Sequence, residues 1–169
     1  MLSTATDVAE KGANSSLDLV FPSASLGEWN LSLEKQTAIT RTEWAMENLP
    51  GKFVLSSSFG IQSAVMLHLL TQVDSNIPIL ITDTGHLFPE TYRFIEQMTE
   101  RLNLNLQVYQ AKESAAWQLA KHGEEWKKSD DALKAYNRRN KVEPLERGLS
   151  ELEASTWFSG VRRQQSEHR

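Results

Sequence analysis

The sequence predicts an α/β fold in which helices cover both faces of a doubly wound, mostly parallel sheet. Short apolar runs alternate along the chain with segments of helical period, which is typical of this class. The run IPILIT at residues 77–82 is continuously apolar, as expected for a strand buried on both faces of a parallel sheet. With 169 residues, 40% of them hydrophobic and 24% charged, the chain is long enough to bury one core.

The elements follow from local patterns in chain order. Pro50 and Gly51 end the first expected helix, and Pro89 opens another helix because proline fits a first helical turn. Between them, a strand, a helix and a second strand form one unit of the usual length, about 30 residues. We expect helices at 32–49, 61–70, 89–102, 114–122 and 144–154, strands at 52–56, 77–82, 104–109 and 156–160, and a polar stretch at 124–141.

Composition limits the organisation and the partners. Residues 1–31 are rich in Ser, Ala, Asn and Asp without a sustained period, so we expect a flexible N-terminal arm there and a single nucleotide-binding domain over residues 32–169. The net charge of −4 argues against a nucleic-acid-binding surface. No apolar run approaches the roughly 18 residues of a membrane span, and the N-terminus has no leader pattern. We therefore expect a soluble, cytoplasmic protein without nucleic-acid or membrane partners.

Polar loops follow three of the predicted strands: SSSFGIQS at 56–63, TDTGHLFPET at 82–91 and GVRRQQSEHR at 160–169. Taken alone, each loop is explained as well by an ordinary turn or helix cap as by a binding site. In an open parallel sheet, however, ligands bind outside the carboxyl ends of the strands. The first loop can offer backbone N–H groups and serine hydroxyls at a helix N-terminus, and Gly60 permits close approach of a ligand. Together the loops predict a phosphate site.

The third loop concentrates positive charge in an otherwise acidic chain. Three arginines, Arg162, Arg163 and Arg169, lie within eight residues. The planar guanidinium group of an arginine can donate two parallel hydrogen bonds to two oxygens of one phosphate or sulfate group. A solvated surface is the alternative for any single arginine pair. His86 lies in the second loop, beside Thr84 and Gly85, and could touch a ligand. The histidines and carboxylates show no metal-binding spacing, so we expect no metal.

Two resemblances follow from these motifs. SFGIQS resembles the SGGxDS phosphate loop of the ATP pyrophosphatase superfamily, with Phe59 in place of the first glycine and Gln62 in place of the aspartate. Gln62 thus favours binding of an adenine nucleotide without cleavage of ATP. SSSFG, TDTGHLFPETY and WFSGVRRQQSEHR, in this order, closely resemble the 3′-phosphoadenylyl sulfate (PAPS) reductases over residues 48–169. That family implies an adenine nucleotide alpha-hydrolase-like (PP-loop) fold.

The resemblance also implies an activity and a site. The family reduces PAPS to sulfite and adenosine 3′,5′-bisphosphate with thioredoxin as electron donor, in assimilatory sulfate reduction and cysteine biosynthesis, usually as a homodimer and without a bound cofactor. Lys141, in KVEPL, stands where the family's lysine contacts the phosphosulfate. The implied substrate-binding residues are Ser56, Ser57, Ser58, Phe59, Gly60, Gln62, Ser63, Thr82, Asp83, Thr84, Gly85, Lys141, Gly160, Arg162, Arg163, Gln164, Ser166 and Arg169.

The chain contains no cysteine. A related family that reduces adenylyl sulfate holds an iron–sulfur cluster, and its adjacent cysteine pair would fall at Tyr136 and Asn137. The resemblance therefore implies no iron–sulfur cluster and favours PAPS as substrate.

The missing thiol also bears on catalysis. The family's nucleophile is a C-terminal cysteine that attacks the sulfur of PAPS, and only a thiolate is nucleophilic enough for that step. We expect this cysteine beyond Arg169, in a segment that the chain lacks, and we expect the chain alone to be inactive. Two alternatives remain open: a catalytically silent nucleotide-binding module, and a PP-loop ATP pyrophosphatase or sulfurtransferase.

Overall fold

The computed structural model describes residues 23–161 of the chain. The chain divides into two compact units, residues 1–41 and 42–169. Among the described residues, no helix combines the length and the apolar character needed to cross a bilayer.

The first unit contains helix α2 (Ser23–Glu34) and the beginning of α3 (Ala38–Asn48). Thr37 separates the two helices, because its hydroxyl accepts a hydrogen bond from the Thr40 N–H at 3.3 Å in the manner of an N-cap. The Arg41 guanidinium donates to carbonyl groups at the end of α2 and just beyond it. The prediction of one helix over 32–49 is therefore wrong, and α2 begins inside the segment expected to be an arm.

The second unit is built on a parallel four-stranded sheet in the order β3-β2-β1-β4. The strands are β1 (Phe53–Ser56), β2 (Pro78–Asp83), β3 (Asn105–Gln110) and β4 (Thr156–Ser159). All four predicted strands are confirmed to within one or two residues. The α/β class and the parallel sheet are confirmed with them.

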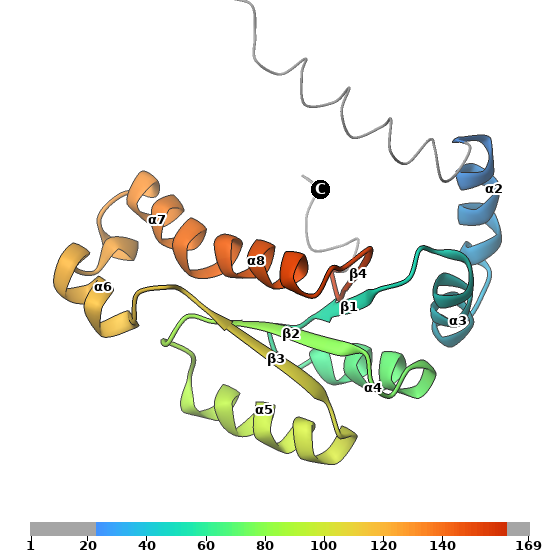
Figure 1. Cartoon of the computed structure of the whole chain (residues 1–169), viewed down its shortest axis with the longest axis horizontal. Helices are drawn as coiled ribbons and strands as arrows, with labels where there is room; N and C mark the ends of the chain where they lie inside the picture. Colours follow the sequence, from blue (N-terminus) through green and yellow to red (C-terminus); the bar gives the residue numbers. More distant parts are fainter. Residues whose placement is uncertain (1–22, 162–169) are drawn as a thin grey trace, which may run out of the picture. The chain divides into compact units, whose positions relative to one another are not determined.

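Helices cover both faces of this sheet (Figure 1). Helices α4 (Ser63–Val73) and α5 (Pro89–Leu102) lie on one face, and α8 (Glu143–Glu151) lies on the other. The alternation of side chains along β2 explains the two layers: Ile79 and Ile81 enter the core with α4 and α5, whereas a Cβ on Gly148 of α8 would lie 2.5 Å from the Leu80 side chain. A continuously apolar strand is thus buried on both sides.

The topology creates a switch point beside β1. The chain moves outward from β1 to β2 and β3 through α4 and α5, and it then returns along α8 to place β4 on the opposite side of β1. The connection from β1 to β2 and the connection from β3 to β4 therefore lie on opposite faces of the sheet. Such a point leaves a crevice at the carboxyl ends of the two strands, where ligands bind in open α/β sheets.

The segment between α6 (Ala115–His122) and α8 is helical, which the sequence did not lead us to expect. The polar stretch 124–141 contains a 3₁₀ turn η1 (Glu125–Lys127), helix α7 (Asp130–Asn137) and a π-helix η2 (Arg138–Val142). Ser129 begins α7 as a side-chain N-cap, accepting from the Ala132 N–H at 3.2 Å. The charged side chains of this segment mostly face solvent, and apolar residues are few among them.

Candidate functional site

The loop after β1 turns sharply through a left-handed residue, and that residue is Phe59. Its φ is +49°, and its ring is 2% exposed within the main apolar cluster. The Phe59 N–H donates to the Ser57 hydroxyl at 3.1 Å, which fixes the turn. Gly60, which follows, does not have a positive φ. Phe59 therefore keeps the backbone shape of a glycine at this position, while its side chain serves the core rather than a ligand.

The four serines of the loop have different surroundings. The Ser56 hydroxyl accepts a hydrogen bond from the Trp157 indole at 2.8 Å, which joins β1 to β4. Ser58 is exposed. The Ser63 Oγ is buried at the start of α4 and has no partner among the described residues. Buried hydroxyls are usually paired, so an orphaned one at a helix N-terminus indicates a place for an acceptor.

A cavity of about 880 Å³ opens between the carboxyl ends of β1 and β4, at the switch point. It joins the first predicted loop to the start of the third. Seven of the predicted substrate-binding residues line it: Ser56, Ser57, Ser58, Gly60, Gln62, Ser63 and Gly160. The wall is completed by Leu55, Ile61, Val65, Met66, Ser159 and Val161. A Cβ on Gly160 would lie 3.3 Å from the Met66 side chain, so β4 ends close against α4.

One wall of this cavity is apolar and accessible. Ile61 is 94% exposed, Val65 69% and Val161 49%. Sequence reasoning missed this wall, although Ile61, in the turn before α4, and Val65, in the first turn of α4, are spaced by four residues and could have been recognised as one face. A polar loop beside an apolar wall suits a ligand that carries both anionic groups and a flat or apolar body, as a nucleotide does.

The loop after β2 is arranged around a buried carboxylate. Asp83 is 9% exposed and accepts three hydrogen bonds of 2.7–2.8 Å, from the Gly85 N–H, the Tyr92 hydroxyl and the Gln110 amide. Burial raises the pKa of Asp83, but these hydrogen bonds outweigh it and leave the pKa below its ordinary value. With its carboxylate engaged in this way, Asp83 shapes the loop, and any ligand contact falls to its neighbours.

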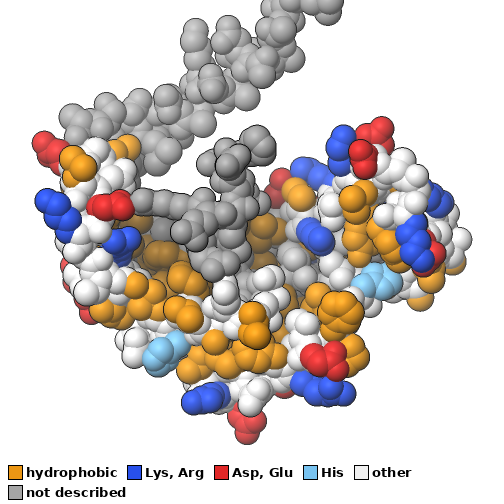
Figure 2. Space-filling view, turned by 180° about the vertical axis from the view of Figure 1, so that it is seen from behind, with side chains coloured by type: hydrophobic (Ala, Val, Ile, Leu, Met, Phe, Trp, Pro, Cys, Tyr) orange, Lys and Arg blue, Asp and Glu red, His pale blue; other side chains and the backbone are white. Residues whose placement is uncertain are grey.

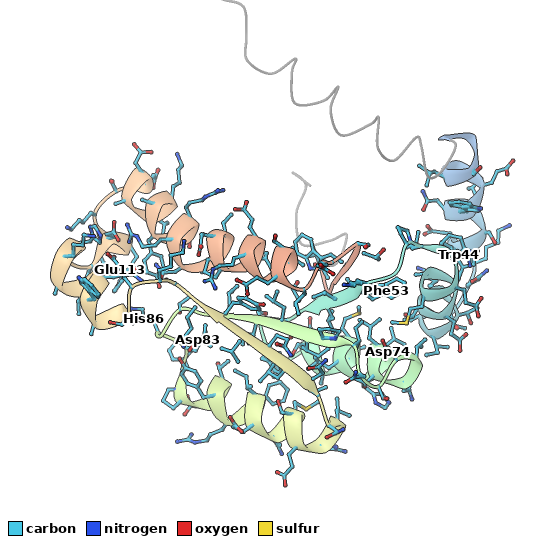
Figure 3. All side chains as sticks on the ribbon, viewed as in Figure 1. Trp44, Phe53, Asp74, Asp83, His86 and Glu113 are labelled. Atoms are coloured by element: carbon cyan, nitrogen blue, oxygen red, sulfur yellow. The ribbon has the colours of Figure 1, made fainter. Side chains whose placement is uncertain are left out.

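Thr82, Thr84 and Gly85 lie at the same edge of the sheet as the cavity but do not line it. Gly85 has a φ of +72°, and a Cβ there would lie 2.9 Å from Ala115, so only glycine fits this turn. His86 follows and packs edge-on against Trp126, with ring centroids 5.3 Å apart. Figure 3 shows Asp83, His86 and Glu113 at one end of the sheet, with Phe53 and Asp74 at the other.

The remaining predicted residues divide into two groups. Lys141 lies in η2, is exposed and does not line the cavity. The segment KVEPL runs without a break from η2 into α8. Arg162, Arg163, Gln164, Ser166 and Arg169 lie outside the described residues. Within the described part of the chain, no cluster of three histidine, aspartate or glutamate side chains could hold a metal ion.

A second cavity of about 460 Å³ lies beyond β3, against α6 and η2. Charges of both signs are interspersed over this end of the molecule (Figure 2). The cations lining the cavity already face carboxylates, because Lys121 pairs with Glu113 at 2.8 Å, Lys112 with Glu143 at 3.6 Å and Arg139 with Glu125 at 2.6 Å. An anionic ligand would have to compete with these carboxylates, so the cavity between β1 and β4 is the better anion site.

Comparison with known proteins gives the family. The model of the phosphoadenosine phosphosulfate reductase domain matches residues 52–169, which include β1 and all three loops. The chain belongs to this family. It is 60% identical over 142 residues to phosphoadenosine 5′-phosphosulfate reductase of Citrobacter koseri and 56% identical over 144 residues to that of Vibrio atlanticus.

These matches cover 84% and 85% of this chain. The chain spans 58% and 56% of the length of the two relatives. A crystal structure of phosphoadenylyl-sulfate (PAPS) reductase from Candida auris, a phosphate complex, superposes with a TM-score of 0.74 at 26% identity, covering 86% of this chain and 70% of the other. The fold described above is therefore the fold of this family.

Proposed function

We propose that the chain is the nucleotide-binding part of a PAPS reductase and that PAPS binds at the carboxyl edge of the sheet. The observation that carries this proposal is the cavity between β1 and β4, which combines a strand-to-helix loop with an apolar wall at the switch point. Membership of the family supports the choice of PAPS among nucleotides.

In this proposal the loop receives the anionic end of the nucleotide. Ser58 and Ser63 offer hydroxyls that no described residue engages, and the N-terminus of α4 adds the positive end of its dipole. Thr82–Gly85 would line the adenosine at the neighbouring strand. Lys141 and the arginines at 162 and 163 would neutralise the phosphate and sulfate groups, for which a chain of net charge −4 needs a local concentration of cations.

The chemistry proposed for the whole reductase needs a thiolate. The thiolate attacks the sulfur of PAPS, the bond from sulfur to the bridging oxygen breaks, and adenosine 3′,5′-bisphosphate leaves. Reduced thioredoxin then supplies two electrons, which releases sulfite and leaves thioredoxin oxidised. The 169 residues contain no cysteine, so the attacking thiol has to come from outside them. The proposal further includes that the whole reductase is a homodimer that works in the cytoplasm in sulfate assimilation. It holds no iron–sulfur cluster at Tyr136 and Asn137.

Calorimetric titration with adenosine 3′,5′-bisphosphate tests the proposed site. A double variant, Ser58→Ala with Ser63→Ala, should bind more weakly than the parent, because it removes the two available hydroxyls. Each lost hydrogen bond to a charged group corresponds to about 1.5–3 kcal/mol, or at least roughly tenfold in affinity. Ser75→Ala is the matched control, since Ser75 is an exposed serine in the turn before β2, at the opposite edge of the sheet.

The competitor identifies the nucleotide class. If AMP and ATP displace bound adenosine 3′,5′-bisphosphate only at much higher concentration, the result supports a site for PAPS. Preference for ATP would instead support a relative of the ATP pyrophosphatases. Equal affinity of the parent and the double serine variant would overturn the assignment of this loop.

A further inference from the structure

A π-helix lies at the carboxyl edge of the sheet, where α7 passes into α8. Helix α8 runs opposite to the strands: Glu143 at its start pairs with Lys112 just after β3, and the Ser155 N–H just after its end donates to the Lys52 carbonyl before β1. The five residues of η2, which precede α8, therefore lie on the side of the sheet where the strands end. π-helices are rare and frequently occur at functional sites.

A pair of buried side-chain amides joins this π-helix to helix α6. Asn140 is 1% exposed and Gln118, on α6, is 5% exposed. Each side chain donates to the other at 2.9 Å. The second N–H of each amide is also used, by the Tyr136 carbonyl at 3.0 Å and by the Glu113 carbonyl at 2.8 Å. The amide donors of the pair are thus fully satisfied, and a fully satisfied buried polar network specifies one arrangement of its elements.

An ion pair reinforces this arrangement from the neighbouring residue. Arg139 donates to the Glu125 carboxylate of η1 at 2.6 Å and to the Gln118 amide oxygen at 3.3 Å. Lys141, the next residue after Asn140, is exposed and has no ion pair with any described residue. Two consecutive residues of η2 are therefore tied to α6 and η1, while the third is left available at the carboxyl edge.

We propose that Gln118 and Asn140 are positioning residues that hold Lys141 in the orientation needed to contact the anionic groups of the nucleotide. Successive residues of an α-helix differ in direction by about 100°, and the step in the wider π-helix is smaller but still a large part of a turn. A slip of the π-helix by one residue would therefore turn Lys141 away from its present direction. Apolar side chains could fill the same space, but they would not specify the register. This inference rests on the proposed function, because it takes Lys141 as a nucleotide contact.

A double-mutant cycle on adenosine 3′,5′-bisphosphate affinity, measured at low salt in the 169-residue chain, tests the proposal. Asn140→Leu should weaken binding by about fivefold or more, a size expected for residues that act as a coupled unit. In the Lys141→Ala background the same change should have an effect of less than about twofold, because the lysine it orients is gone. Gln118→Met removes the α6 member of the amide pair and should weaken binding in the same way. The test therefore remains valid if one of the two variants folds poorly.

Ile95→Val is the control for general destabilisation, since Ile95 is a buried core residue on α5, on the other face of the sheet. It should lower the melting temperature without changing affinity. A parent that binds, with effects of Asn140→Leu and Lys141→Ala that simply add, would overturn this inference alone. A parent that does not bind the bisphosphate would overturn the proposed function and this inference together.

Discussion

At the scale of single residues, Phe59 shows how the loop keeps its shape without the expected glycine. Its left-handed backbone costs energy for any residue with a Cβ, and the burial of its ring within the main apolar cluster offsets that cost. The strained turn and the core are thus coupled at one position. A glycine would fit the backbone equally well but would leave a cavity in the core.

Phe59→Gly should therefore destabilise the chain, although it relieves the backbone. Loss of a buried aromatic ring typically costs about 3–5 kcal/mol, and relief of the left-handed conformation returns roughly 1 kcal/mol. We expect a net decrease of about 2–4 kcal/mol in the free energy of unfolding, measured by urea denaturation. A stability equal to that of the parent would show that the ring does not hold the loop against the core.

Asp83 should make stability depend on pH in the acid range. Its folded pKa lies below the ordinary value of 3.8, so its contribution is fully present above that value and is lost as the pH falls through the lower, folded pKa. Asp83→Asn should remove this part of the acid sensitivity. The urea midpoints of parent and variant should therefore differ by a constant amount above pH 3.8 or so and converge as the pH falls below 3.8 through the folded pKa. A difference that stays constant below pH 3.8 would contradict the role given to the carboxylate.

At the scale of elements, the packing of α8 on the sheet depends on one glycine. A Cβ on Gly148 would lie 2.5 Å from the Leu80 side chain and 2.9 Å from the Tyr109 ring. Gly148→Ala should therefore force the helix away from β2 and β3 and lower the free energy of unfolding by about 1–3 kcal/mol. Ser150→Ala, at an exposed position of the same helix, is the control and should be neutral or slightly stabilising. Equal effects of the two changes would mean that α8 packs more loosely.

The elements also show what local sequence could and could not reveal. The helix from Pro89 to Leu102 was predicted with its observed bounds, because proline marks its first turn and a buried stripe runs along it. The break at Thr37 and helix α7 were missed, since their signals are single capping side chains in polar surroundings. The left-handed angle of Phe59 could not be read at all, because nothing local distinguishes it from an ordinary phenylalanine.

At the scale of the whole molecule, the site depends on strand order, which local patterns do not contain. The sequence indicated that three polar loops share one edge. Only the order β3-β2-β1-β4 shows that the loop after β1 and the end of β4 line one cavity while the loop after β2 lies beside it. The serines after β1 lie together at this edge, and their contact with a ligand stays a prediction, whereas the apolar wall at Ile61 and Val65 emerged from the fold.

Binding and turnover should separate in this chain. It carries a cavity suited to a nucleotide but no cysteine to accept the sulfo group. With PAPS and reduced thioredoxin, the 169-residue chain should therefore release no sulfite, although it should bind adenosine 3′,5′-bisphosphate. Sulfite production by this chain alone would show that the reaction does not need the thiol assumed here.

The location of the bound nucleotide tests the central claim most directly. In a titration of isotopically labelled chain with adenosine 3′,5′-bisphosphate followed by NMR, the amide resonances of Ser58, Gly60 and Ser63 should shift with occupancy. Those of Ser75 and Asn76, at the opposite edge of the sheet, should stay in place. Saturable binding that leaves the loop after β1 unchanged and shifts Lys112 and Lys121 instead would place the nucleotide in the charged cavity beyond β3 and contradict the site proposed here.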